Sequence, residues 1–346
     1  MSVSDNYAEE RKAGRIVFNQ PWSTFAEPGE RFRNTAEKAN EQGRPVMVLA
    51  EISQSEVWDP VCHNMPNPHK VIRLFRTAAQ LDGVNGVCDF WGHRGPFLSH
   101  ANHCAMRAWL DRPADTEQEL LKTAAAKHYN IDPADTNLVD AALRCWQQFA
   151  DAVDDWALTM WGQRLSYAVG RDGARGFFYR ALIPENLRWL IDKGRLKGLE
   201  KRGIDIDGFN AYLHRDRDVF SETARRFERL ADALRGKGSP AGASLADREA
   251  VNIELAGELI AGTGRTFAAA IAFRKRDAER LRQLIEEEIE ARARELELSG
   301  RTGWGAGVNP LLVEEDMQNM CLYLSRDDFP DSPDECFHFT YTPYSM

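Results

Sequence analysis

The feature that most constrains this chain is a near-continuous apolar run, PVMVLAEIS, at residues 45–53. Runs of this kind, rich in valine, are typical of parallel strands that are buried on both faces. Two further apolar segments resemble it in length, one at residues 15–20 with Ile-Val-Phe at its centre and one, VNGVCDFW, at residues 84–91. We therefore predict three strands in the N-terminal third of the chain.

Amphipathic segments alternate with these strands. Residues 28–42 and 68–81 each carry an apolar stripe at three-and-four spacing, with Gly43 and Gly83 as stops. A third helix is predicted from Ser99 to about Leu110. The alternation predicts a parallel sheet with right-handed crossovers. A closed barrel needs eight strands and about 250 residues, so the region is either a small open sheet or the tail end of a barrel.

Beyond about Asp115 the periodicity is helical. Helices are predicted over residues 116–128, with Asp115 and Thr116 as the cap, and over residues 138–160, 184–197, 209–234 and 245–298, the last broken near Gly262 and Gly264. Residues 236–244 are predicted to be a loop. The expected fold class is α/β followed by mainly α, with a partial (β/α) barrel-type parallel sheet in residues 1–112. A helical domain then covers residues 113–300, and an irregular tail with a short strand covers residues 301–346.

Charge and cysteine usage exclude several classes of function. The chain has 44 Lys and Arg residues against 53 Asp and Glu residues, a net charge of −9. It therefore lacks the overall basic character of a general nucleic-acid binder. No apolar stretch of about 18 residues predicts a spanning helix, and the polar start does not resemble a secretory signal. The six cysteines are scattered without a CxxC pair, which is typical of reduced thiols. We expect a cytoplasmic protein with no nucleic-acid and no membrane partner.

Polar side chains follow the predicted strands at their carboxyl ends, where parallel α/β sheets gather functional groups. A pair of carboxylates there can supply the general acid and the nucleophile or base of glycoside hydrolysis. Tryptophans can stack on a sugar ring, and His or Arg can bind its hydroxyls or a sugar carboxylate. The candidate catalytic residues are Glu51, Glu56 and Asp89, and the candidate substrate-binding residues are Gln54, Trp58, Trp91, His93 and Arg94. Each of these can instead be a loop or ion-pair residue.

A group of histidines and cysteines gives a weaker pattern. His100, His103 and Cys104 fall at i, i+3 and i+4, so a helix places them on one face, and His93, Cys62 and His63 lie upstream. Zinc accepts such ligands, but the spacing matches no zinc signature. The polar start of a helix explains the group better, so no metal and no other cofactor is predicted.

Two segments together resemble a known family. In EISQSEVWDP a strand ends in a Ser-Glu step, and a proline-rich loop, a helix and a Gly-Val-Xaa-Gly-Val strand ending in tryptophan follow. A helix with Ala-Leu-Arg-Cys-Trp-Gln-Gln-Phe comes later. Over residues 15–200 this pattern resembles the last barrel strands and helical extension of bacterial glycoside-hydrolase-like (β/α)8 proteins. In that pattern Ser55 stands where the family usually has Trp.

The resemblance implies both roles and a function. Glu56 would lie after the seventh strand, Trp91 would close the eighth, and the helices near 138–157 and 183–200 would form the extension. The implied activity is hydrolysis of O-glycosidic bonds in a carbohydrate, with the chain an incomplete or inactive hydrolase because the first five strands are missing from it.

Two other classes of function stay open. The chain can be a non-catalytic helical interaction protein, in which the acidic and basic helix near residues 280–297 offers a surface for a homo-oligomer. A third interpretation is that the chain is a metal-dependent enzyme that uses the histidine group. The carbohydrate interpretation requires Glu51, Glu56 and Asp89 to surround one cleft.

Overall fold

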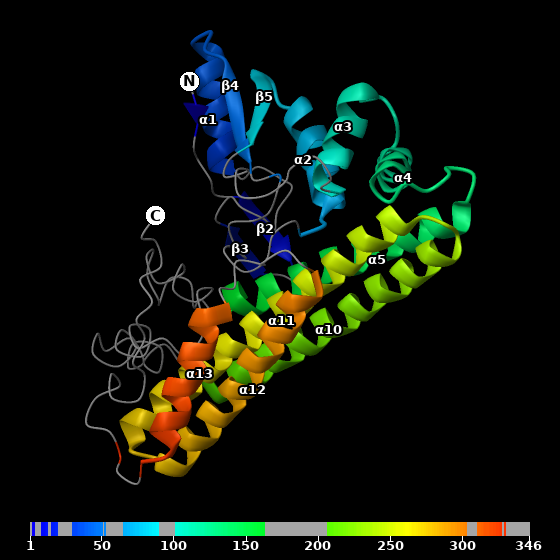
Figure 1. Cartoon of the computed structure of the whole chain (residues 1–346). Helices are drawn as coiled ribbons and strands as arrows, with labels where there is room; N and C mark the ends of the chain where they lie inside the picture. Colours follow the sequence, from blue (N-terminus) through cyan, green and yellow to red (C-terminus); the bar gives the residue numbers. More distant parts are fainter. Residues whose placement is uncertain are drawn as a thin grey trace. The chain divides into compact units, whose positions relative to one another are not determined.

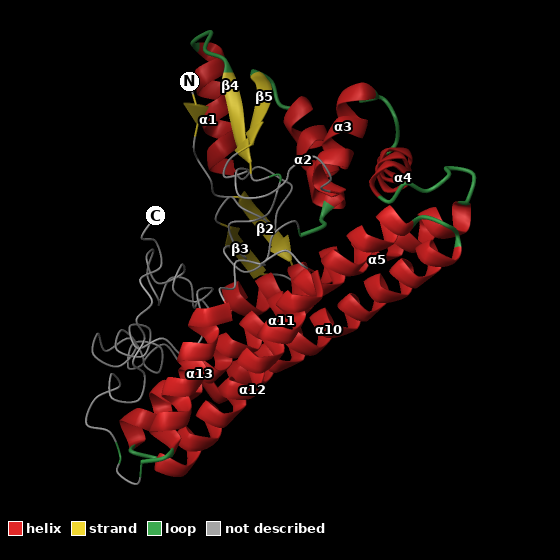
Figure 2. Cartoon of the chain, in the orientation of Figure 1, coloured by secondary structure: helices red, strands yellow, loops and turns green. Residues whose placement is uncertain are grey.

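The computed structural model describes residues 2–3, 8–12, 15–19, 30–50, 52, 65–89, 101–162, 206–302, 310–326 and 329. These residues are mostly helical, with a small parallel sheet and a separate hairpin (Figure 1, Figure 2). They belong to two compact units, one comprising Met1–Gly162 and Phe220–Ile253, the other Gln163–Val219 and Glu254–Met346. The described strands form no closed barrel. No helix in these ranges is long and apolar enough to cross a membrane.

The parallel sheet of the first unit has the strand order β1–β4–β5. Strand β4 (Val46–Ala50) is central, and β1 (Ser2–Val3) and β5 (Val84–Asp89) pair with it in parallel. Helix α1 (Glu30–Glu41) precedes β4, and α2 (Pro68–Ala79) connects β4 to β5. The strands follow chain order across the sheet. Right-handed crossovers in one direction place their helices on the same face.

The burial of β4 side chains agrees with this arrangement. Val46 and Val48 are buried and form a hydrophobic core with Ala36 and Ala39 of α1 and Ala78 of α2. Met47 points to the other face and is 38% exposed. The Val46 and Val48 face of this strand therefore meets the helices.

The strand predicted at residues 15–20 forms, but its predicted place in the parallel sheet is wrong. Strand β3 (Arg15–Asn19) pairs antiparallel with β2 (Ala8–Lys12) in a separate two-stranded sheet. Lys12 is the partner of Arg15, so the hairpin closes across two residues, a length that suits antiparallel pairing. The sequence AEERK of β2 is polar and shows no alternation of apolar and polar residues. Hydrophobicity alone therefore does not predict β2 as the partner strand of β3.

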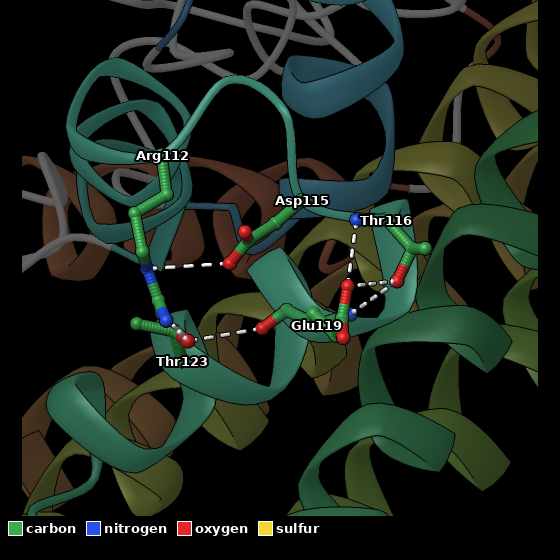
Figure 3. A network of polar contacts seen from close by, with 5 residues as sticks. All are labelled: Arg112, Asp115, Thr116, Glu119 and Thr123. Carbon is green, nitrogen blue, oxygen red and sulfur yellow. Dashed lines mark hydrogen bonds and ion pairs between the residues drawn. The ribbon is translucent and has the colours of Figure 1, made fainter.

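Helix α4 (Glu117–His128) confirms both the predicted helix and its predicted cap. The Thr116 N–H donates to Oε2 of Glu119 at 2.8 Å, and the Glu119 N–H donates to Oγ1 of Thr116 at 3.3 Å, which makes a capping box (Figure 3). Arg112 pairs with Asp115 at 3.3 Å and donates to the Thr123 hydroxyl. These contacts hold the first turns of the helix that ends at His128.

The remaining helices follow the predictions at most positions. They are α3 (Ala101–Asp111), α5 (Thr136–Gly162), α10 (Ile206–Gly236), α11 (Pro240–Lys275), α12 (Ala278–Thr302) and α13 (Pro310–Leu324). Helix α11 starts at Pro240, inside the predicted loop 236–244, because proline suits a first helical turn. Helix α13 lies in the segment 301–346 that was predicted to be irregular. The helix predicted at residues 184–197 falls outside the described ranges.

The predicted break near Gly262 and Gly264 is wrong, because both residues lie inside α11. The helix ends instead at Lys275, and Arg276 follows it with a φ of 56°. There the Asp277 N–H donates to the Ala272 carbonyl at 2.9 Å, a left-handed end of the Schellman type. The Asp277 side chain then accepts the Arg280 N–H at 3.1 Å and caps α12.

Candidate functional site

The carboxyl ends of β4 and β5 lie side by side in the sheet. Ala50, the last residue of β4, is the register partner of Asp89, the last residue of β5. The segments that follow the two strands therefore start at the same edge of the sheet. In parallel sheets, ligands bind at this edge, beyond the carboxyl ends of the strands. The side chain of Asp89 is outside the described part, as are the other candidates: Glu51, Gln54, Glu56, Trp58, Trp91, His93 and Arg94. A common cleft for these residues stays a prediction.

Asn102 of α3 joins the two ends of the segment that follows β4. Its Nδ2 donates to the Ile52 carbonyl at 2.7 Å and to the Met65 carbonyl at 3.1 Å, and its Oδ1 accepts the Asn67 N–H at 2.7 Å. The Asn102 side chain is fully buried, so these bonds satisfy backbone groups that would otherwise lose their partners. Ile52 and Met65 bracket residues 53–64, which contain Gln54, Glu56 and Trp58. One amide therefore closes the base of the segment that carries these candidates.

The histidines and cysteines considered as zinc ligands form no metal site within the described part of the chain. His103 and Cys104 lie on α3, whereas His93, His100, Cys62 and His63 are outside the described ranges. Within those ranges no three His, Cys, Asp or Glu side chains are arranged to hold a metal ion.

A buried polar cluster that the sequence did not indicate joins α4, α5 and α11 in the first unit. Oε1 of Glu249 lies 3.0 Å from Nε2 of His128, and Oε2 of Glu249 accepts the Tyr129 hydroxyl at 2.5 Å. The Tyr129 oxygen accepts Nε1–H of Trp146 at 3.0 Å. All four residues are buried. We call His128, Tyr129, Trp146 and Glu249 the Glu249 cluster.

The electrostatics of the Glu249 cluster centre on one ion pair. Burial by itself lowers the pKa of His128, but the Glu249 carboxylate and the Cys104 thiol of α3 outweigh it and raise that pKa to about 9. Burial raises the pKa of Tyr129 well above its ordinary value, and the Glu249 carboxylate adds to the effect. Burial likewise raises the pKa of Cys145 to about 12. At neutral pH His128 is therefore protonated, whereas Tyr129 and Cys145 are neutral.

The second unit contains buried charges of its own, between α11 and α12. Glu288 pairs with Arg265 at 2.6 Å through one oxygen and with Arg292 at 2.9 Å through the other. Arg292 also lies 3.4 Å from Glu295. All four side chains are buried. An arrangement of this kind can hold two helices in one register.

Local sequence patterns carried no signal for the Glu249 cluster. Trp146 falls inside the helix predicted over residues 138–160, and His128 is the last residue of the helix predicted over residues 116–128. Glu249 lies in an amphipathic stretch with many other charged residues, and 121 positions separate it from His128. Only the packing of α11 against α4 shows which carboxylate is buried.

Comparison of the chain with protein-family models, with curated proteins and with solved structures gives no match.

Proposed function

We propose that this chain is a glycoside-hydrolase-like protein whose carbohydrate site lies at the carboxyl edge of the β4–β5 sheet. The observation that carries the proposal is the arrangement of that sheet. Parallel neighbours follow one another in chain order, and α1 and α2 pack on the Val46 and Val48 face. The wall of a (β/α) barrel has this one-sided arrangement, whereas a doubly wound sheet carries helices on both faces.

The anchoring of the segment after β4 supports the same site. A catalytic carboxylate works only when its supporting residues hold it within a fraction of an ångström. Asn102 fixes Ile52 and Met65, the points where residues 53–64 begin and end. We assign Glu56 to this site as one catalytic carboxylate, with Glu51 or Asp89 as its partner. Such a pair supplies the general acid and the nucleophile or base of glycoside hydrolysis.

The test is hydrolysis of a panel of chromogenic aryl glycosides by the purified chain. Glu56→Gln is expected to lower turnover by about 10²–10⁴-fold without a change in the unfolding midpoint, because the variant keeps shape but loses the ionisable group. Glu37→Gln, on an exposed position of α1, is the matched control and should retain full turnover. Unchanged turnover in Glu56→Gln rules out the role of Glu56. A wild-type chain that neither hydrolyses nor binds any sugar overturns the proposal.

A further inference from the structure

The N-terminus of α2 lies at the carboxyl edge of the parallel sheet, next to the end of β4. The Asn102 side chain fixes this position, because its amide accepts the Asn67 N–H at 2.7 Å and donates to the Ile52 carbonyl at 2.7 Å. Ile52 comes two residues after the end of β4, and Asn67 immediately precedes α2. The positive end of the α2 helix dipole is therefore at the edge where parallel sheets bind their ligands.

The side chain of Asn67 is fully buried at this helix end and does not cap the helix. Neither its Oδ1 nor its Nδ2 has a hydrogen-bond partner among the described residues. An asparagine in this position ordinarily accepts an N–H of the first turn. Each unsatisfied buried polar group costs about 1–3 kcal/mol, so the amide marks a place where a bound molecule gains free energy by pairing with it.

The first turn of α2 favours a negatively charged molecule. It contains Lys70 and no acidic residue. The Val71 N–H donates to the Asn67 carbonyl at 3.4 Å. The N–H of His69 precedes it, and the Asn67 side chain does not accept that group. Backbone donors and the helix dipole together make such an end suitable for an anion.

His69 adds a further polar atom to the same turn. Its Nε2 is buried and has no hydrogen-bond partner in the described part of the chain, whereas its Nδ1 lies 3.7 Å from Oε1 of Glu117. Arg73 pairs with the same carboxylate oxygen at 3.3 Å. The charge of Glu117 is therefore partly neutralised by Arg73, and it does not exclude an anion from the turn.

The amide of Asn67 restricts the kind of anion. It needs one acceptor and one donor, whichever way its oxygen and nitrogen are assigned. Carboxylate and sulfate carry no proton near neutral pH, so they only accept hydrogen bonds. A phosphate group, with a second pKa of about 6, keeps one P–OH in its monoanion. It can therefore accept from Nδ2 and donate to Oδ1 at the same time.

We propose that the N-terminus of α2, together with the Asn67 amide, binds the phosphate group of a phosphorylated ligand. The phosphate oxygens accept Nδ2–H of Asn67 and the His69 N–H, and the P–OH donates to Oδ1 of Asn67. The inference goes beyond the carbohydrate proposal and does not depend on it. Phosphate binding by a chain that neither hydrolyses nor binds any sugar would leave the phosphate site in place and overturn the carbohydrate site alone.

Isothermal titration calorimetry of the full chain with inorganic phosphate and with sulfate, both at pH 6, tests the preference between the two ions. Phosphate should bind about 10-fold more tightly than sulfate, because sulfate leaves Oδ1 of Asn67 without a donor. Equal affinities for the two ions overturn the proposal. So does the absence of phosphate binding, even in a chain that hydrolyses aryl glycosides.

Asn67→Ala locates the site. The substitution removes the side-chain amide but keeps the backbone bonds of this residue to Asn102 and Val71, so the variant should fold. It should bind phosphate about 10-fold more weakly than the wild type and no better than sulfate. Asn34→Ala, at an exposed position of α1, is the matched control and should keep the wild-type affinity.

Circular dichroism checks that Asn67→Ala is folded. A folded variant that keeps the wild-type affinity for phosphate overturns the proposal. If the variant does not fold, the preference of the wild type for phosphate over sulfate decides the matter.

Discussion

Nε2 of His128 and Oε1 of Glu249 lie 3.0 Å apart in the interior of the first unit, although 121 residues separate them in the chain. The contact joins the end of α4 to α11. Both side chains are buried, so each charge is compensated mainly by the other. Loss of one partner would leave the second group without charge compensation in the low-dielectric interior.

Glu249→Ala should therefore lower the free energy of unfolding by about 3–5 kcal/mol, because buried His128 loses the carboxylate that compensates its charge and Tyr129 loses its acceptor. Urea unfolding followed by tryptophan fluorescence measures the change. Asp247→Ala is the matched control, since Asp247 pairs with Arg235 at the surface and should cost no more than about 1 kcal/mol. Similar losses in the two variants would contradict the buried pairing.

The same pair predicts how stability depends on pH. The pKa of His128 is raised from 6.5 to about 9 in the folded chain, so the folded state binds the proton more tightly. The resulting stabilisation is fully present below about pH 6.5 and is lost as the pH rises through about 9. We expect the free energy of unfolding to fall by on the order of 1–3 kcal/mol across this window, measured as urea midpoints at a series of pH values. His128→Gln should flatten the curve there, and an unchanged slope would contradict the assignment.

Asn102→Ala should weaken the anchoring of residues 53–64. The substitution leaves the carbonyls of Ile52 and Met65 and the N–H of Asn67 without this partner, at a cost of about 3 kcal/mol in unfolding free energy. Limited proteolysis should cut within residues 53–64 faster than in the wild type. Asn34→Ala, at an exposed position of α1, should leave both the stability and the cleavage rate unchanged. Equal cleavage in the two variants would show that Asn102 does not hold the segment.

The capping box of α4 can be tested at Thr116. Thr116→Ala removes the side-chain acceptor of the Glu119 N–H and should cost about 1 kcal/mol, whereas Thr116→Ser keeps the hydroxyl and should cost much less. Thermal unfolding distinguishes the two. A serine variant as unstable as the alanine variant would assign the effect to the lost methyl group rather than to the cap.

In the second unit, Glu288→Ala should be strongly destabilising. It removes the carboxylate that Arg265 and Arg292 share in the interior, a loss of about 3–5 kcal/mol. Arg294→Ala, which breaks the more exposed pair with Glu254, is the comparison and should cost about 1 kcal/mol or less. Urea unfolding measures both variants, and the opposite ranking would contradict the buried network.

The local sequence pattern was enough to predict many of the helices. An apolar stripe at three-and-four spacing marks a helix face that is buried in the folded chain, whichever element packs against it. Helices α1, α2, α4, α5 and α10 appear close to their predicted bounds, and the cap of α4 is the predicted one. The β4–β5 pair was predicted for the same reason, since its apolar runs suit strands covered by helices. The candidate site could be traced only to the edge of this sheet.

Tertiary structure decided what a local pattern does not encode. The direction of β3 depends on its partner β2, and the break after α11 depends on the left-handed Arg276 rather than on a glycine. The Glu249 cluster exists because helices distant in the chain pack together and bury one carboxylate among many. Burial, charge pairing and strand direction are properties of the partner as much as of the residue, so they arise only when the chain is folded.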